Sequence, residues 1–316
     1  MQEQTPDKQR SDRDGQTGAP RRKVTIRQLL EKKARGERIT SIGVYDSPMA
    51  AIADRVGFDL LIIGNAGPMS LLGHSDPTTV TFEEQLILTR AVSRVARYGL
   101  IVAHLPYMSY HASKAQAITS AARMISEGGA DVVKCEGNRY TAEYVAEIVR
   151  AGIPVMGHMG MQASRRTEQS GFGVKGRTAE DALQIVDSTR AFAEAGAFAF
   201  IVEHVPVEVT RNLSESLSTP IISLGAAPDA DGIYHISGDV VGYSAFPIPP
   251  NRGSFADVRP IIEQALGDYR REVEAGTYPP AEGAYHMPDG ERERFLQLAP
   301  TQPASPSSVD SVRQEA

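Results

Sequence analysis

The feature that most constrains the fold is a series of eight short apolar runs separated by longer amphipathic segments. Most of the runs are rich in Ile, Val, Leu or Phe. Continuous apolar runs of this kind are typical of strands that are buried on both faces of a parallel sheet. The eight predicted strands lie within residues 39–46, 59–67, 100–107, 131–137, 153–160, 198–206, 220–227 and 239–244.

The segments between these runs carry helical periodicity, most clearly at residues 82–98, 113–129 and 179–196. Two of them finish on glycine, which is a common helix stop. Eight strands alternating with helices over about 250 residues predict an α/β fold, a (β/α)8 TIM barrel. A doubly wound open sheet is the alternative, although no G-x-G-x-x-G opens a helix after the first strand and no Walker-type loop is present.

Both ends of the chain differ in composition from this central part. Residues 1–22 are polar and nearly free of large apolar side chains, so we predict a disordered segment. The barrel is expected to be a single catalytic domain over residues 23–278. Residues 279–316 are predicted to form an appendage followed by a disordered tail rich in Pro and Ser.

Charge and cysteine content exclude several classes of protein. The formal net charge of −6, without a basic run interleaved with aromatic residues, argues against a nucleic-acid partner. A single cysteine, Cys135, excludes an internal disulfide framework. No apolar run approaches membrane-spanning length. We therefore expect a soluble cytoplasmic protein without a membrane partner.

Almost every predicted strand ends in an ionisable or hydrogen-bonding residue, although the strand interiors are apolar. In a (β/α)8 barrel these carboxyl ends meet at the face that carries the active site. Burying so many polar groups is costly unless they serve one another, a ligand or a metal. The sequence therefore predicts one polar site there. The residues at these ends are Tyr45, Asp46, Asn65, His104, Lys134, Glu136, His158, Glu203, His204, Ser223 and Asp239.

Three of these positions suggest specific chemistry. Lys134 and Glu136 are two residues apart on one strand, so their side chains point the same way. An ammonium group beside a carboxylate suits a substrate oxyanion next to a metal or a proton-transfer group. Glu203, at the end of an apolar strand, is a candidate general base, and an ion pair with Lys134 or an arginine is the alternative.

A metal site is a further hypothesis at the same face. His104, Glu136 and His158 offer two imidazoles and a carboxylate, which suit Zn, Mn, Fe or Co better than Mg. A hydrogen-bonded His–Glu–His network without metal would explain the same residues, so both interpretations stay open.

The order of the motifs resembles the ketopantoate hydroxymethyltransferase family, a branch of the phosphoenolpyruvate mutase/isocitrate lyase superfamily. The resemblance runs from about Ile26 to about Tyr278. Many motifs in the right order make it specific, although each alone would be weak. They are "YDSPMAAIAD", "GNAGPMSLLGH", "LPYMSY", "GGADVVKCEG", "AGIPVMGHMGM", "VKGR", "VEHVPVEV", "STPIISLGA" and "EVEAGTYP".

This resemblance implies a barrel that assembles into a homo-oligomer and binds Mg through the 2-oxo and carboxylate oxygens of 3-methyl-2-oxobutanoate. A glutamate removes a C3 proton, and the enolate attacks the one-carbon unit of methylenetetrahydrofolate. By position, Glu203 would be the base, Lys134 and His158 would contact the substrate carboxylate, and Glu136 would be one metal-site carboxylate. A metal and a lysine would stabilise the enediolate.

Two departures from the family pattern fall on the implied metal site. The family's Gly-Asp-Ser is Gly64-Asn65-Ala66 here, and its Ala-Asp-Leu-Pro is Ala103-His104-Leu105-Pro106. The formal charge of the metal ligands changes from about −3 to about −1, so Mg²⁺ should bind more weakly. Either a nitrogen-preferring metal (Zn, Mn or Fe) binds through His104, or the metal is lost and Lys134 with the histidines carries the oxyanion.

Glu203 and Lys134 are thus the predicted catalytic residues. The predicted substrate contacts are Tyr45, Asn65, Ala66, Lys134, His158 and Ser223, and the candidate metal ligands are His104, Glu136 and Asn65. The first hypothesis is an enzyme that enolises a 2-oxo acid, on a non-standard substrate, for aldol-type one-carbon transfer or the reverse C–C cleavage. A catalytically silent paralogue that binds a small carboxylate is the second hypothesis. A metal-dependent hydrolase or decarboxylase of a small carboxylate is the third.

Overall fold

A computed structural model describes residues 21–226, 228–244, 246–248 and 253–299 of the chain. Most of the predicted N-terminal segment and the end of the predicted C-terminal tail lie outside these residues, so their disorder stays a prediction. Contacts between Cα atoms divide the chain into two units, Met1–Val258 and Arg259–Ala316. This division falls after Val258, earlier than the expected domain limit at residue 278. The expected limit stays a prediction.

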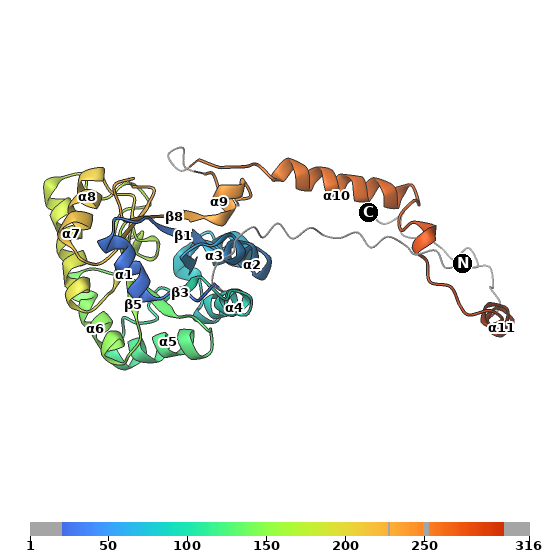
Figure 1. The fold of residues 1–316 in the computed structure, drawn as a ribbon, viewed down its shortest axis with the longest axis horizontal. Coiled ribbons are helices and arrows are strands. Elements are labelled where there is room, and N and C mark those ends of the chain that lie inside the picture. Colours follow the sequence, from blue (N-terminus) through green and yellow to red (C-terminus); the bar gives the residue numbers. More distant parts are fainter. Residues whose placement is uncertain (1–20, 227, 245, 249–252, 300–316) are drawn as a thin grey trace, which may run out of the picture. The chain divides into compact units, whose positions relative to one another are not determined.

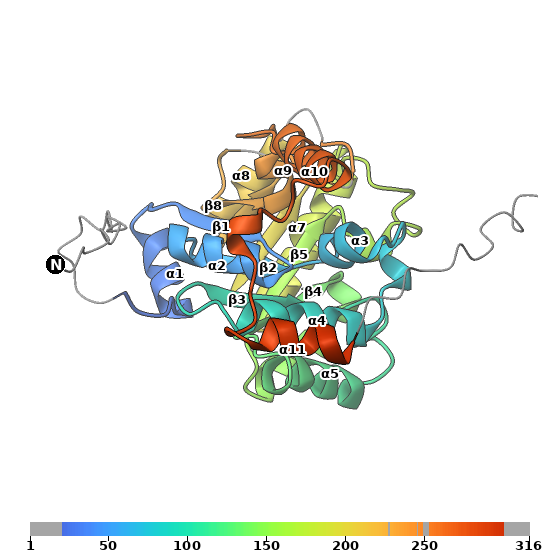
Figure 2. The ribbon, with the colours of Figure 1, turned by 90° about the vertical axis from the view of Figure 1, so that its right-hand side faces the viewer.

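The first unit contains a closed barrel of eight parallel strands in sequential order, which confirms the predicted (β/α)8 TIM barrel. Each strand pairs with its neighbours in the chain, and β1 closes the barrel against β8. Helices surround the strands (Figures 1 and 2). The strands are β1 Ile39–Gly43, β2 Leu60–Ile63, β3 Leu100–His104, β4 Val132–Glu136, β5 Val155–Gly160, β6 Ala199–Glu203, β7 Ile221–Leu224 and β8 Gly232–Ile236.

The helices of this unit follow the strands in turn, and the three segments with the clearest periodicity are confirmed as α4, α5 and α7. No helix within the described ranges is both long and apolar enough to cross a membrane. The helices are α1 Ile26–Ala34, α2 Ser47–Val56, α3 Ala66–Leu72, α4 Phe82–Ser93, α5 Lys114–Ser126, α6 Ala142–Arg150, α7 Ala179–Glu194, α8 Val207–Ser216 and α9 Ser237–Val241. Short 3-10 turns lie at η1 Pro77–Thr79, η2 Arg139–Thr141 and η3 Ala163–Arg165.

Two apolar layers stabilise the barrel, because successive residues of a strand point to opposite faces. One layer fills the interior and includes Ile62, Val102 and Val132. The other lies between strands and helices and includes Ile63 and Ala103. This alternation directs the polar residues at the ends of β3 to β6 into the barrel mouth.

The eighth strand is the one incorrect strand prediction. The apolar run at residues 239–244 was expected to be a strand, whereas Asp239 lies in helix α9 and β8 is Gly232–Ile236. The sequence pattern did not predict β8 because burial alternates along it: Tyr234 is buried, whereas Ile233 is 46% exposed. A search for continuous apolar runs does not find such a strand.

The second unit, taken by itself, consists of the amphipathic helix α10 (Arg259–Glu274), the turn η4 (Ala281–Gly283) and helix α11 (Glu291–Leu298). The rings of Tyr269 and Tyr278 meet edge to face, with centroids 5.2 Å apart.

Candidate functional site

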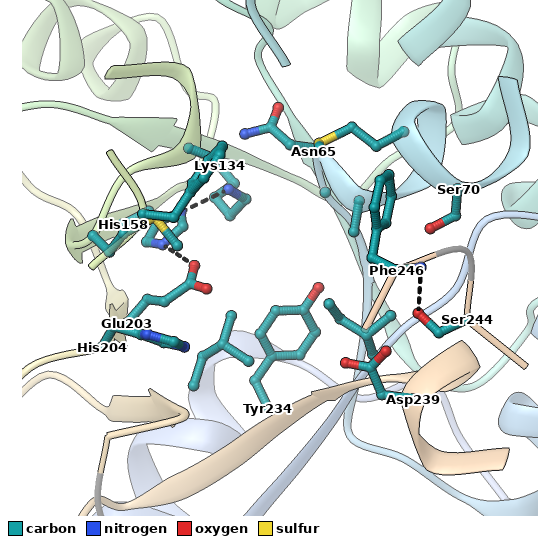
Figure 3. A pocket seen from close by; sticks show the side chains of 18 of the residues that line it. Asn65, Ser70, Lys134, His158, Glu203, His204, Tyr234, Asp239, Ser244 and Phe246 are labelled. Carbon is teal, nitrogen blue, oxygen red and sulfur yellow. Dashed lines mark hydrogen bonds and ion pairs between the residues drawn. The ribbon is translucent and has the colours of Figure 1, made fainter. Parts of the chain in front are cut away.

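A cavity of about 350 Å³ lies at the carboxyl ends of the strands (Figure 3). Strands β4, β5 and β6 present Lys134, His158 and Glu203 to it. The hydroxyl of Tyr234 and the carboxylate of Glu203 point toward its centre. The cavity therefore has an ionisable wall at one side and a tyrosine facing it.

The structure brings most of the predicted site residues together. Five border the cavity, namely Asn65, Ala66, Lys134, His158 and Glu203. His204, directly after β6, and Asp239, which lies in helix α9, also line it. His104 and Glu136 are fully buried behind this wall.

Two predicted substrate contacts, Tyr45 and Ser223, are not among the described residues that line the cavity. Ser223 alternates with Ile222 and Leu224, which pack inside the barrel, so its side chain faces the outer layer. Tyr45 is buried in the outer layer. Burial and the neighbouring hydroxyl of Tyr234 raise the pKa of Tyr45 well above the usual range.

His158 connects the candidate base to the candidate cation. Its Nε2 lies 3.1 Å from Oε2 of Glu203, and its Nδ1 lies 3.0 Å from Nζ of Lys134. An ion pair with Lys134 was the alternative to Glu203 as a general base, and these contacts place the imidazole of His158 between the two side chains. The cluster is buried, since Lys134 is 2% exposed and Glu203 is 7% exposed.

The backbone around Glu203 is closely constrained. The N–H of Met161 donates to the carbonyl oxygen of Glu203 at 2.8 Å. Gly160 has a φ of +84°, and a Cβ at this position would overlap the same oxygen. His204, directly after Glu203, has a φ of +48°, which is uncommon for a residue with a side chain. These constraints fix the end of β6 and with it the carboxylate of Glu203.

Burial and charge shift the pKa values of this cluster in different directions. Burial lowers the pKa of Lys134, although the nearby carboxylates oppose this effect. Burial and Lys134 also act to lower the pKa of His158, but its hydrogen bonds to Glu136 and Glu203 raise it above the usual range. Burial and Lys134 hold the pKa of His104 well below the usual range, so this imidazole is neutral.

Glu136 is surrounded by hydrogen-bond donors from the protein itself. Its Oε1 accepts from Nδ2 of Asn65 at 2.9 Å, and Nδ1 of His158 lies 3.3 Å from the same oxygen. Nζ of Lys134 lies 3.8 Å from it. Oε2 accepts from the backbone N–H of Ser164 at 2.9 Å. Burial would raise the pKa of Glu136, but the bond from His158 and the nearby charges hold it well below the usual range.

Ser164, in turn η3, connects the two positions that depart from the family pattern. Its Oγ accepts from Nδ2 of Asn65 at 3.2 Å and lies 3.5 Å from Nε2 of His104. Its backbone N–H is the donor to Glu136. Sequence reasoning missed Ser164 and Tyr234, because one lies in an irregular turn and the other in the strand that was placed too late in the chain.

These contacts allow a test of whether the residues fit the magnesium ion that the resemblance implies. Mg²⁺ requires anionic or neutral oxygen ligands with free lone pairs in octahedral geometry. Glu136 is the one carboxylate of the three candidate ligands, and both of its oxygens already accept hydrogen bonds. An ammonium group and an imidazole lie beside it. No group of three His, Cys, Asp or Glu side chains suited to a metal occurs within the described residues. The arrangement does not fit Mg²⁺.

A closed parallel barrel with a buried acid–base cluster at the carboxyl ends of its strands defines a (β/α)8 barrel enzyme. Solved structures share this fold at low sequence identity. 2,3-Dimethylmalate lyase, a member of the PEP mutase/isocitrate lyase superfamily, has a TM-score of 0.51 at 16% identity, covering 87% of this chain and 99% of that chain. Phosphonopyruvate hydrolase in complex with oxalate and Mg²⁺ has a TM-score of 0.52 at 13% identity, covering 86% and 98%.

Sequence comparison is more specific. Residues 23–281 match the profile of the ketopantoate hydroxymethyltransferase family. The 3-methyl-2-oxobutanoate hydroxymethyltransferase of Moorella thermoacetica is 39% identical over 267 residues, covering 84% of this chain and 99% of the relative. The enzyme of the same name from Chloroflexus aggregans is 40% identical over 266 residues, covering 84% and 94%. The chain belongs to the ketopantoate hydroxymethyltransferase family, as the motifs indicated.

Proposed function

We propose that this chain enolises a 2-oxo acid in the barrel-mouth cavity and forms or breaks a C–C bond at the adjacent carbon. The observation that carries the proposal is the chain of contacts from Glu203 through His158 to Lys134. The two contacts measure 3.1 Å and 3.0 Å. A carboxylate base and a cation on one wall of the cavity, joined by an imidazole, suit proton removal next to a carbonyl group. The hydroxymethyltransferase-like activity of the family is of this type.

The proposed step starts with the substrate carboxylate and 2-oxo oxygen near Lys134. Glu203 takes the proton from C3, the C–H electron pair becomes the C2–C3 double bond, and the carbonyl pair moves to the 2-oxo oxygen. Lys134 stabilises the negative charge that develops there, because the attraction between an ammonium group and an oxyanion is stronger in a buried site than in water. The oxyanion pair then re-forms the 2-oxo group as C3 bonds to an electrophilic one-carbon unit. The π pair of that unit moves to its own heteroatom, which takes the proton from Glu203, and cleavage follows the same steps in reverse.

The lining of the cavity supports a substrate with an apolar substituent. Met69, Met161, Phe172, Leu224 and Phe246 contribute apolar surface, and a pocket of this type favours branched aliphatic groups over charged ones. The relatives are named for 3-methyl-2-oxobutanoate, which carries such a group. Ala66 removes the serine hydroxyl of the family pattern, so we propose that the substrate differs or binds in a different pose.

Two further expectations come from the family resemblance alone. Methylenetetrahydrofolate as the one-carbon donor and a homo-oligomeric assembly both stay proposals. Formation of the hydroxymethylated acid from 3-methyl-2-oxobutanoate, measured with and without methylenetetrahydrofolate, tests the donor. Size-exclusion chromatography coupled to light scattering tests the assembly.

The decisive experiment measures deuterium exchange at C3 of 3-methyl-2-oxobutanoate, and of a panel of other 2-oxo acids, by proton NMR in D₂O. The wild-type protein should catalyse exchange, with or without the folate. Glu203→Gln should lower the exchange rate by about 10²–10⁴-fold, because the base is lost. Glu208→Gln, an exposed glutamate in the first turn of α8, is the matched control and should leave the rate unchanged.

Silence across the panel from a folded protein would contradict the proposal and favour the silent paralogue that binds a small carboxylate. Release of CO₂ or of a hydrolysis product without exchange at C3 would instead favour a decarboxylase or a hydrolase. A reaction that needs Zn, Mn or Fe would support His104 as a metal ligand.

A further inference from the structure

The two departures from the family pattern, Asn65 and His104, are not independent of each other. Both side chains contact the hydroxyl of Ser164, at 3.2 Å from Nδ2 of Asn65 and 3.5 Å from Nε2 of His104. Asn65 and Ser164 also donate to the two oxygens of Glu136. These four residues therefore form one buried hydrogen-bonded unit.

The contacts within this unit pair donors with acceptors, whereas Oδ1 of Asn65 and Nδ1 of His104 are buried without a hydrogen-bond partner among the described residues. The amide of Asn65 has two N–H donors, and Nδ2 uses them on Oε1 of Glu136 and on Oγ of Ser164. The Ser164 hydroxyl retains its own proton for the neutral imidazole of His104. The orientation of the amide is determined by chemistry, since its carbonyl oxygen would repel the carboxylate oxygen 2.9 Å away unless a cation lay between them.

The charge around Glu136 is also compensated without a metal. The ammonium group of Lys134 lies 3.8 Å from Oε1, and the imidazole of His158 lies 3.3 Å from it. A divalent cation at this carboxylate would displace the Asn65 donor and lie next to a buried ammonium group, which is costly in a low-dielectric site. Two aspartates at positions 65 and 104, by contrast, would leave three carboxylates together and would need a cation.

We propose that the unit of Asn65, His104 and Ser164 takes the place of a divalent cation at Glu136, so that the site is folded and binds its ligand without metal. Of the two outcomes that the sequence left open, the contacts favour metal loss. The proposal concerns the same site as the proposed function, but it does not depend on the reaction, because the measurements below need no turnover.

The test compares thermal unfolding of the wild type, Asn65→Ala and Asn65→Asp in EDTA and in excess Mg²⁺ or Mn²⁺, together with Mn²⁺ binding followed by electron paramagnetic resonance. The titrations are made with and without oxalate, a planar dianion that resembles an enolised 2-oxo acid. For the wild type, we expect the same unfolding midpoint in EDTA and in excess metal. For Asn65→Ala, we likewise expect no difference between the two conditions. Asn65→Ala is the matched control, because it removes the amide donor without adding charge.

Asn65→Asp should behave differently from both. Two carboxylates within hydrogen-bond distance cannot both be ionised without a cation, so this variant should unfold earlier in EDTA than Asn65→Ala. Excess Mg²⁺ or Mn²⁺ should restore its midpoint. The double variant Asn65→Asp, His104→Asp should bind Mn²⁺ at least about 100-fold more tightly than the wild type, because affinity follows the number of anionic oxygens.

One tightly bound Mn²⁺ per wild-type chain, lost on Glu136→Gln, would overturn the proposal. A wild-type midpoint that falls in EDTA and recovers with metal would do the same. Should the aspartate variants fail to fold, the wild-type titration alone decides: weak or absent Mn²⁺ binding supports the proposal and tight binding overturns it. Failure of the C3 exchange experiment with unchanged metal-independence would remove only the proposed reaction.

Discussion

The two ends of the barrel both carry buried or half-buried charged residues, but they use them in opposite ways. At the amino end of the barrel, where the strands begin, each of the aspartates described below has hydrogen-bond donors that it does not share with another carboxylate. At the carboxyl end, Glu136 and Glu203 share His158 and lie beside a cavity. The comparison separates charges that hold the chain in place from charges that are available to a ligand.

The amino end repeats one arrangement three times. An aspartate directly before β2, β4 and β8 accepts a backbone N–H from the start of a neighbouring strand and binds a lysine at 2.7 Å. The motif glycine–Phe/Ala–aspartate in the sequence marks two of these positions. The aspartates are Asp59, Asp131 and Asp231, their backbone donors belong to Thr40, Ile101 and Ile221, and their lysines are Lys32, Lys23 and Lys33.

The carboxyl end lacks this one-to-one matching. The imidazole of His158 contacts two carboxylates and one ammonium group. Such shared partners put the imidazole of His158 in contact with acidic and basic groups at once, an arrangement that general acid–base catalysis uses. Burial of a charge alone therefore does not indicate function, whereas shared partners and an adjacent cavity do.

The largest expected effect is at the carboxyl end. Lys134→Gln should lower the C3 exchange rate by about 10²–10³-fold, because the cation that stabilises the developing oxyanion is lost. The fold should survive, since Glu136 keeps its bonds from Asn65 and Ser164. Lys32→Gln at the amino end is the matched control, and it should lower the unfolding midpoint without slowing exchange. Equal loss of exchange in both variants would break the comparison.

The next effect concerns the amino end, where Asp54 accepts the backbone N–H groups of Arg97, Tyr98 and Gly99 before β3. Asp54→Ala leaves the buried N–H of Gly99 and the half-buried N–H groups of Arg97 and Tyr98 without their acceptor. The free energy of unfolding should therefore fall by about 3 kcal/mol. Urea unfolding measures this loss. Exchange per folded molecule should not change; a slower rate in fully folded protein would show that this end also serves the reaction.

A smaller effect is expected in the pH dependence of stability. Burial acts to raise the pKa of Asp54, but its bonds to Gly99, Arg97 and Tyr98 outweigh burial and lower it. A lowered carboxyl pKa contributes stability above the unfolded value of about 3.9, and the contribution is lost as the pH falls through the folded pKa. Urea unfolding from about pH 7 to about pH 3 should therefore show a steeper acid loss for wild type than for Asp54→Asn. Parallel curves would contradict the assignment.

The smallest effect tests whether every polar cluster near the carboxyl ends is functional. Thr81 and Glu84 form a capping box at the start of α4, with bonds of 3.2 Å and 2.8 Å between side chains and backbone N–H groups. Thr81→Ala should cost about 1 kcal/mol of unfolding free energy and leave exchange unchanged. Thr81→Ser, which keeps the hydroxyl, should be close to wild type; a loss of exchange in Thr81→Ala alone would assign the cap to the site.

Much of the fold and part of the site could be predicted. Seven strands were located, because a strand buried on both faces is a continuous apolar run. The alternation of side chains also predicted that Lys134 and Glu136 point to the same face. The same alternation would have directed Ser223 outward, had Ile222 and Leu224 been recognised as the interior pair.

The contacts that distinguish this site could not be predicted. Asn65 is 71 residues from Glu136 and 99 residues from Ser164, yet its amide bonds to both. No local pattern marks Ser164, since it lies in a 3-10 turn without periodicity. The tyrosine that faces Glu203 was missed because β8 is half-exposed at Ile233.

Strand periodicity and the order of elements are properties of neighbouring residues, so the amino-acid sequence was enough to predict the barrel and the ionisable residues at its mouth. The pairing of donors with acceptors depends on the folded barrel. There the Asn65 amide and the Ser164 N–H bind Glu136, and His158 lies between Lys134 and Glu203. The physical reason is that a hydrogen bond depends on distances of about 3 Å and on direction, which closure of the barrel sets between strands far apart in the chain.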